Sequence, residues 1–176
     1  CRVLQLLYFQ APSLRNARLT EGNPSNFPLR NLIGSLLHIA IIARPDISFS
    51  LQQCARHTAN PTEGSVSAAK RVLAYLKGTL EDGPEYSEEI ESSFRDTYEC
   101  LLKKTTTVLP NVVAFSDADF GGDTVSLKST SGSILYYRGV PVAWRSKLQS
   151  IRALSTTEAE YCAAYDTLNL FRAQGW

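Results

Sequence analysis

Apolar residues between positions 28 and 43 recur at three- and four-residue spacing, which predicts an amphipathic helix. Pro28 suits the first turn of that helix, where its missing N–H costs nothing. Pro45 disfavours helical geometry at the preceding residue, so the helix should end near Ala43. The first predicted element is therefore a helix that begins at about Pro28.

Two more helices are predicted before residue 80. Asp46 offers an N-cap for a helix over residues 47–57, and Thr62 offers one for a helix that Gly78 would end. Together the three helices predict a helical segment over residues 28–79. Residues 1–27, by contrast, contain an apolar run and then prolines, glycine and asparagines, and they predict an irregular N-terminal segment.

Residues 80–108 are charged, and they predict an acidic surface excursion with little regular structure. Their acidic cluster comprises Glu88, Glu89 and Glu91. After Pro110 the pattern becomes strand-like. Strands are expected over 112–115, running into Ser116-Asp117, and over 133–137 and 140–146, with Arg138-Gly139 as the hairpin turn.

A helix should begin at Ser155, because Ser155 and Glu158 have the S-x-x-E spacing of a capping box. The expected fold class is therefore α/β, in the broad sense that includes α+β. A helical connection segment is followed by a β-β-β-α unit within residues 109–176.

The composition fits a folded protein, with 44% hydrophobic and 20% charged residues. The net charge of +1 excludes a protein that binds nucleic acid by bulk charge, although a local basic patch stays open. The longest apolar run, 36–43, is far shorter than the ~20 residues of a membrane span, so no membrane association is expected.

The four cysteines have no zinc-type spacing, and free thiols in a reducing compartment are favoured over disulfides. They are Cys1, Cys54, Cys100 and Cys162. The sequence also lacks methionine and begins at Cys1, so we expect a fragment of a longer protein. An intracellular location is expected, in the cytoplasm, a virus-like particle or the nucleus.

Two carboxylates are candidates for chemistry. Asp117 closes an apolar strand, and Glu160 lies in the second turn of the helix that follows the three strands. If the helix packs on the sheet, the two acids can converge, and a divalent cation such as Mg²⁺ would then relieve their repulsion. Two solvated surface acids are the alternative, and spacing by itself favours that alternative.

Asp119 shares a strand face with Asp117, and it is a further candidate metal ligand, with a turn-facing structural role as the alternative. Trp144, Arg145 and Lys147 form an aromatic and basic cluster late in the third strand. This cluster could contact a nucleic-acid backbone, or it could be a solvated strand end with a packed tryptophan.

Five motifs, in order, resemble the copia-type retrotransposon Pol polyproteins. They are LIGSLLHIAIIARPDISFSL at 32–51, NPTEGSVSAAKRVLAYLKGT at 60–79, FSDADFGGD at 115–123, KSTSGSILYYRGVPVAWRSKLQ at 128–149 and ALSTTEAEYCAA at 153–164. The first two resemble the end of the reverse transcriptase and its connection. The last three resemble the N-terminal half of the ribonuclease H domain.

The resemblance implies a ribonuclease H fold, which cleaves the RNA strand of an RNA–DNA hybrid with two Mg²⁺ ions. It assigns the first metal-binding aspartate to Asp117 and the glutamate to Glu160. The family site uses four acids, and the other two would lie beyond Trp176. Little or no activity is therefore expected of this chain, and its partners would be the hybrid and the remainder of the polyprotein.

Two alternatives to a nuclease stay open. One is a non-catalytic nucleic-acid-binding or interaction module derived from a transposon. The other is the product of a decayed copy with no function.

Overall fold

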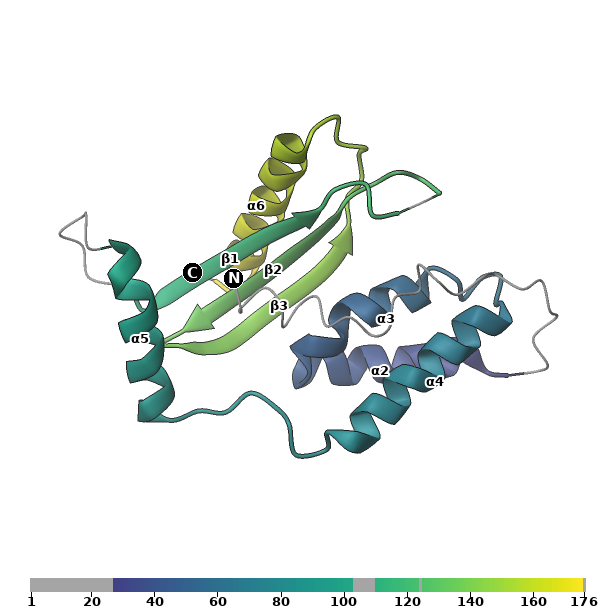
Figure 1. The fold of residues 1–176 in the computed structure, drawn as a ribbon, viewed down its shortest axis with the longest axis horizontal. Coiled ribbons are helices and arrows are strands. Elements are labelled where there is room, and N and C mark those ends of the chain that lie inside the picture. The colour runs from purple at the N-terminus through teal and green to yellow at the C-terminus, as the bar shows by residue number, and fades with distance from the viewer. Residues whose placement is uncertain (1–26, 103–109, 124, 176) are drawn as a thin grey trace. The chain divides into compact units, whose positions relative to one another are not determined.

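The computed structural model describes residues 27–102, 110–123 and 125–175, and it divides the chain into two compact units, Cys1–Gly83 and Pro84–Trp176. The irregular segment expected over residues 1–27 lies almost wholly outside the described residues. Figure 1 shows helices in the first unit and a sheet with two helices in the second. The mixed α and β class expected from the sequence is confirmed.

The first unit contains α2 (Leu29–Ile42), the short 3-10 helix η2 (Pro45–Ile47), α3 (Ser48–Ala55) and α4 (Glu63–Gly78). Thr62 caps α4 as predicted, because its side chain accepts from Ser65 N and the Ser65 hydroxyl accepts from Thr62 N. The helices share one core, whose aliphatic members include Leu29, Ile33, Leu36, Ile47, Leu51, Val72 and Leu76.

Asp46 does not cap a helix, so that prediction is wrong. Its carboxylate instead accepts hydrogen bonds from the buried Arg44 guanidinium, at 2.7 Å from Nη2, and from the Tyr75 hydroxyl at 2.9 Å. Arg44 also donates to the Thr79 carbonyl at 2.7 Å. This network ties the turn after α2 to the C-terminal end of α4. A buried guanidinium needs an anionic partner, and Asp46 is that partner for Arg44. Its carboxylate is therefore not available to cap a helix.

The second unit contains α5 (Glu88–Leu102), β1 (Val112–Asp119), β2 (Thr130–Tyr137), β3 (Val140–Leu148) and α6 (Thr156–Ala173). The strands form an antiparallel sheet in the order β1-β2-β3. The predicted hairpin between β2 and β3 is confirmed, with positive φ at Arg138 and Gly139.

The helix α5 corrects the expectation of an irregular excursion over residues 80–108. Ser87 accepts from Ile90 N through its hydroxyl at 3.3 Å, acidic residues occupy the first turn, and Phe94 and Tyr98 follow at four-residue spacing. These are helix signals that the acidic composition obscured. The helix also includes Leu101 and Leu102.

Aromatic contacts hold α5 on one face of the sheet. Phe94 stacks on Tyr136 with a centroid distance of 5.2 Å, and Tyr98 lies 5.2 Å from Phe115. At Gly139 a Cβ would lie only 2.8 Å from the Phe94 Cβ, so the helix approaches the hairpin closely. Figure 1 shows α5 crossing the end of the sheet where β1 begins.

Polar contacts hold α6 on the opposite face. Thr167 Oγ1 lies 2.7 Å from Ser133 Oγ, and Gln149 Nε2 donates to Ser131 Oγ at 3.1 Å and to the Ala159 carbonyl at 2.9 Å. All these side chains are buried. Ser133 and Tyr136 differ by an odd number of positions on β2, so alternation puts α6 and α5 on different faces.

We expect Asp46→Ala to lower the free energy of unfolding of the first unit by about 3 kcal/mol, because it leaves a buried guanidinium without its anionic partner. Far-ultraviolet circular dichroism during urea denaturation, with amide exchange in α4, measures the change. Asp82→Ala is the matched control, because Asp82 is exposed and its side chain has no hydrogen bond in the described structure. Equal stability of the two variants would contradict a stabilising role for the network.

For the second unit, we expect Phe94→Ala to cost about 2 kcal/mol of unfolding free energy, since it removes the stacked ring that covers Tyr136. Trp144 fluorescence during denaturation reports on this unit. Ser92→Ala on the outer face of α5 should leave the midpoint nearly unchanged.

Candidate functional site

The two acids singled out by their sequence positions come together in the structure. Asp117 lies near the end of β1, and Glu160 lies in the second turn of α6. The side chains are close enough for a hydrogen bond between the two carboxyl groups, and the backbone N–H of Ala118 also donates to Glu160. The expected convergence of Asp117 and Glu160 is thus present, while their catalytic and metal-binding roles stay predictions.

Local interactions position Glu160. Ser155 caps α6 by accepting from Glu158 N at 3.1 Å, which confirms the predicted N-cap. The Glu158 carboxylate accepts from Leu154 N at 2.6 Å, one residue before the cap, so the reciprocal bond of a capping box is shifted. Ala159 and Ala163 are fully buried against the sheet, and their neighbour Glu160 is therefore directed to the flank of the helix.

The surroundings of Glu160 raise its pKa above the ordinary value. Partial burial is the largest cause, and the charge of Asp117 and the hydrogen bond to it act in the same direction, whereas the Ala118 N–H acts in the opposite direction. Glu160 as a whole residue is exposed, so its carboxyl group is only partly shielded from solvent. Two carboxyl groups held in this way favour a shared proton or a cation between them.

Asp119 does not join this pair. Although it lies two residues after Asp117, its carboxyl group packs over Gly122, where an added Cβ would clash with it. Within the part of the chain that the structure describes, no group of three or more His, Cys, Asp or Glu side chains is placed to hold a metal ion. The turn-facing alternative for Asp119 is the one that fits.

The predicted aromatic and basic cluster is divided by the sheet. Trp144 pairs with Ile134, whereas Arg145 and Lys147 pair with Ser133 and Ser131 on the face that carries α6. Side chains of adjacent strand residues point to opposite faces, so Trp144 cannot act together with Arg145 and Lys147. Lys147 Nζ lies 3.7 Å from Asp166 Oδ1, and this ion pair partly neutralises the positive charge of Lys147.

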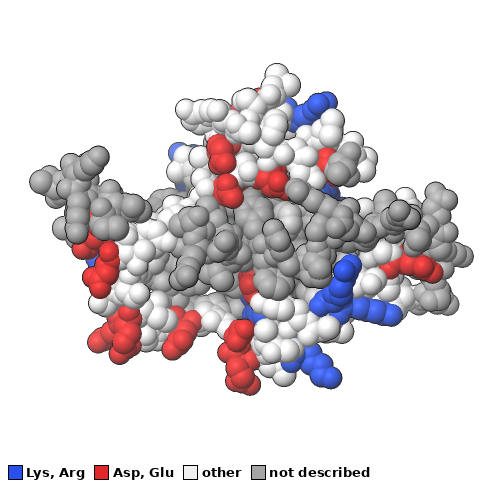
Figure 2. Space-filling view, in the orientation of Figure 1, with Lys and Arg blue, Asp and Glu red and all other residues white. Residues whose placement is uncertain are grey.

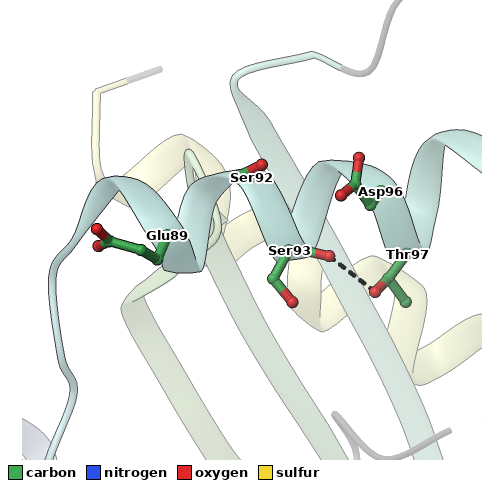
Figure 3. Close-up of a pocket in the computed structure, with 5 residues that line it drawn as sticks. All are labelled: Glu89, Ser92, Ser93, Asp96 and Thr97. Atoms are coloured by element: carbon green, nitrogen blue, oxygen red, sulfur yellow. Dashed lines mark hydrogen bonds between the residues drawn. The ribbon is translucent and has the colours of Figure 1, made fainter.

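Two hollows of the second unit lie away from the acid pair. A groove of about 680 Å³ separates β3 from α6, and its lining includes Lys147, Gln149, Tyr161, Tyr165 and Asp166. The other lies on the outer face of α5, where Figure 3 shows Glu89, Ser92 and Asp96 along the helix surface and Thr97 bonded to the Ser93 carbonyl. Figure 2 shows acidic side chains gathered over α5. This acidic surface on α5 would repel nucleic acid.

The fold and the site define an α+β protein with a paired-carboxylate site at one sheet edge. The Pol polyprotein of transposon TNT 1-94 from Nicotiana tabacum is 34% identical over 147 residues, which are 84% of this chain and 10% of that polyprotein. That of transposon RE1 from Arabidopsis thaliana is 36% identical over 78% of this chain and 8% of its own length. A protein named secreted RxLR effector protein 161, from Plasmopara viticola, is 33% identical over 78% of this chain and 84% of its own length.

The chain is therefore homologous to a segment of the retrovirus-related Pol polyproteins of transposons. It spans about a tenth of the length of the Pol polyproteins that it matches. No family model matches the sequence, and no solved structure is similar enough to count as a match. Among the described residues, no helix has the length and apolar character required to cross a membrane.

We expect Glu160→Gln to become more stable relative to the wild type as pH rises. The folded-state pKa of Glu160 is raised above 4.5, so its contribution to stability is present at low pH and is lost as pH increases through the raised pKa. Thermal denaturation across this range measures the difference between the two proteins. Glu85→Gln, at an exposed position of the same unit, is the control. A difference that does not change with pH would contradict the described contact.

Proposed function

We propose that residues 84–175 are the nuclease part of a transposon Pol polyprotein, of the ribonuclease H type. The substrate would be an RNA–DNA hybrid, and the reaction would be hydrolysis of a phosphodiester bond in the RNA strand. The observation that carries the proposal is the meeting of Asp117 and Glu160 at the edge of β1. The remainder of the polyprotein would be a partner, and the site of action would be inside the cell.

The chemistry of the pair fits a divalent cation. Asp117 and Glu160 supply carboxylate oxygens, which are the ligands that Mg²⁺ prefers. Burial raises the pKa of Glu160 most, the charge of Asp117 raises it further, and a cation would relieve the repulsion between the two carboxylates. When bound, Mg²⁺ supplies activation of water and stabilisation of the leaving oxygen in phosphodiester hydrolysis. Asp117 and Glu160 would hold it, with positions left for water and phosphate oxygens.

The packing of α6 prepares the pair for this task. The buried hydrogen bonds of Gln149 and Thr167 fix α6 on the sheet. Glu160 is therefore held beside Asp117 by the packing of its helix. A site built on a helix and a strand keeps its geometry better than one built on loops.

Metal binding tests the site. We expect Mn²⁺, as a paramagnetic substitute for Mg²⁺, to broaden the NMR signals of residues next to Asp117, and Asp117→Asn to weaken this binding about tenfold or more. Asp119→Asn is the matched control and should have little effect, because its carboxyl group faces Gly122. Equal loss in both variants would argue against the assignment of the pair.

Cleavage of a labelled RNA–DNA hybrid tests the activity. We expect little or no Mg²⁺-dependent turnover by residues 1–176, because two carboxylates hold two ions less firmly than a fuller ligand set. Robust turnover that Asp117→Asn abolishes would show an active nuclease and overturn the expected weakness. Turnover that survives this substitution would overturn the assignment of the site.

A non-catalytic module that binds nucleic acid is the second candidate. It is favoured by the absence, within the described ranges, of any group of three metal-binding side chains. Hybrid binding that is independent of Mg²⁺ and of Asp117 would support the module over the nuclease.

A further inference from the structure

The outer edge of β1 presents backbone groups that β2 does not use. Arg138 N donates to the Asn111 carbonyl at 2.7 Å, in the same register that pairs Val112 with Tyr137. In an antiparallel ladder only every second residue bonds to the neighbouring strand. Asp117 therefore directs its backbone groups to β2, whereas those of Ala114 and Ala118 point away from it. Among the described strands, β1 has no neighbour on this outer side.

Glu160 reaches this outer edge from α6. The helix packs on the face of β1 and β2, and Glu160 lies on its flank, next to the buried Ala159. Its carboxylate accepts the hydrogen bond of the outward Ala118 N–H and lies beside the Asp117 carboxyl group. Two independent observations, the register of the sheet and the contact of the Glu160 side chain, thus identify the same donor, which is the backbone N–H of Ala118.

We propose that Ala118 is a positioning residue, whose outward backbone N–H anchors the Glu160 carboxylate beside Asp117 before any cation is bound. This inference rests on the proposed metal-binding role of the pair. Two carboxylates repel each other, and an N–H dipole aimed at one of them offsets part of that repulsion. A strand backbone holds this donor more rigidly than a side chain would.

The side chain of Ala118 has no part in this role. Only a substitution that removes the backbone N–H of residue 118 should therefore weaken the position of Glu160. Proline removes that N–H, and proline is tolerated on an edge strand where the N–H faces outward. Ala118→Pro and Ala114→Pro are a matched pair, because each removes one outward N–H of β1 and no bond to β2. Ala118→Ser keeps the N–H and serves as the conservative variant.

Mn²⁺ binding provides the first measurement. We expect Ala118→Pro to weaken binding about tenfold, while Ala114→Pro and Ala118→Ser bind as the wild type does. Folding of each variant is checked by Trp144 fluorescence. Equal Mn²⁺ affinity of the two proline variants would overturn the proposal.

Amide hydrogen exchange provides a second measurement, without metal and without proline. We expect the Ala118 amide to be protected in the wild type and to exchange about tenfold faster in Glu160→Ala, because that substitution removes its acceptor. The outward amide of Ala114 should be fast in both proteins. If Ala118 exchanges as fast as Ala114 in the wild type, the anchor does not exist.

The Mn²⁺ and amide-exchange measurements distinguish the metal-binding role of the acid pair from the anchoring role of the Ala118 N–H. A wild type that does not bind Mn²⁺, with Ala118 protected by Glu160, would refute the metal-binding role and retain the anchor. A wild type that binds Mn²⁺, with Ala118 unprotected, would retain the metal-binding role and refute the anchor.

Discussion

The single register in which β1 pairs with β2 is the constraint on which the second unit depends. It decides that Phe115 and Tyr136 share the face that α5 covers, and that Ser133 lies on the face that α6 covers. It also turns the N–H of Ala118 away from β2, toward Glu160. A shift by one residue would exchange both faces and direct the Ala118 N–H into the ladder. The acid pair and both helix contacts would be lost together.

The two faces of the sheet are covered by different physical means. Aromatic rings join α5 to the sheet, and such contacts contribute mainly through buried area and ring geometry. The contact of α6 is a seam of buried hydroxyl and amide groups that includes Thr167, Ser133 and Gln149. Buried polar groups are costly without partners, so the bonds of Thr167, Ser133 and Gln149 Nε2 restrict the position of α6, while Gln149 Oε1 has no hydrogen-bond partner among the described residues. The position of Glu160 follows from that restriction.

In the first unit, too, a buried polar group needs partners, and these partners fix how neighbouring segments pack. Arg44 is buried, and a buried guanidinium requires an anion and further acceptors. Asp46 and Thr79 meet this requirement, and the Tyr75 hydroxyl donates to the Asp46 carboxylate. A residue that resembles a helix cap by its position is therefore used to join two segments that lie far apart in the sequence.

The sequence by itself determined the elements whose signals are local. Periodic apolar positions and the caps Thr62 and Ser155 predicted helices that the structure contains, and strand-like runs bounded by turn residues predicted three strands. It also singled out Asp117 and Glu160, because an acid at the end of an apolar strand and an acid early in the next helix are recognisable from position. Spacing along the chain made their contact an expectation and no more, since it does not specify where a helix packs.

Only the tertiary structure decided the remainder. The acidic residues of α5 obscured its local helix signals, and only the structure shows which rings of the sheet its aromatic side chains contact. The separation of Trp144 from Arg145 and Lys147 required a strand register. The bond from Ala118 to Glu160 depends on which backbone groups β2 leaves unused. Each of these features joins residues distant in the chain, and a local pattern contains no information about such pairs.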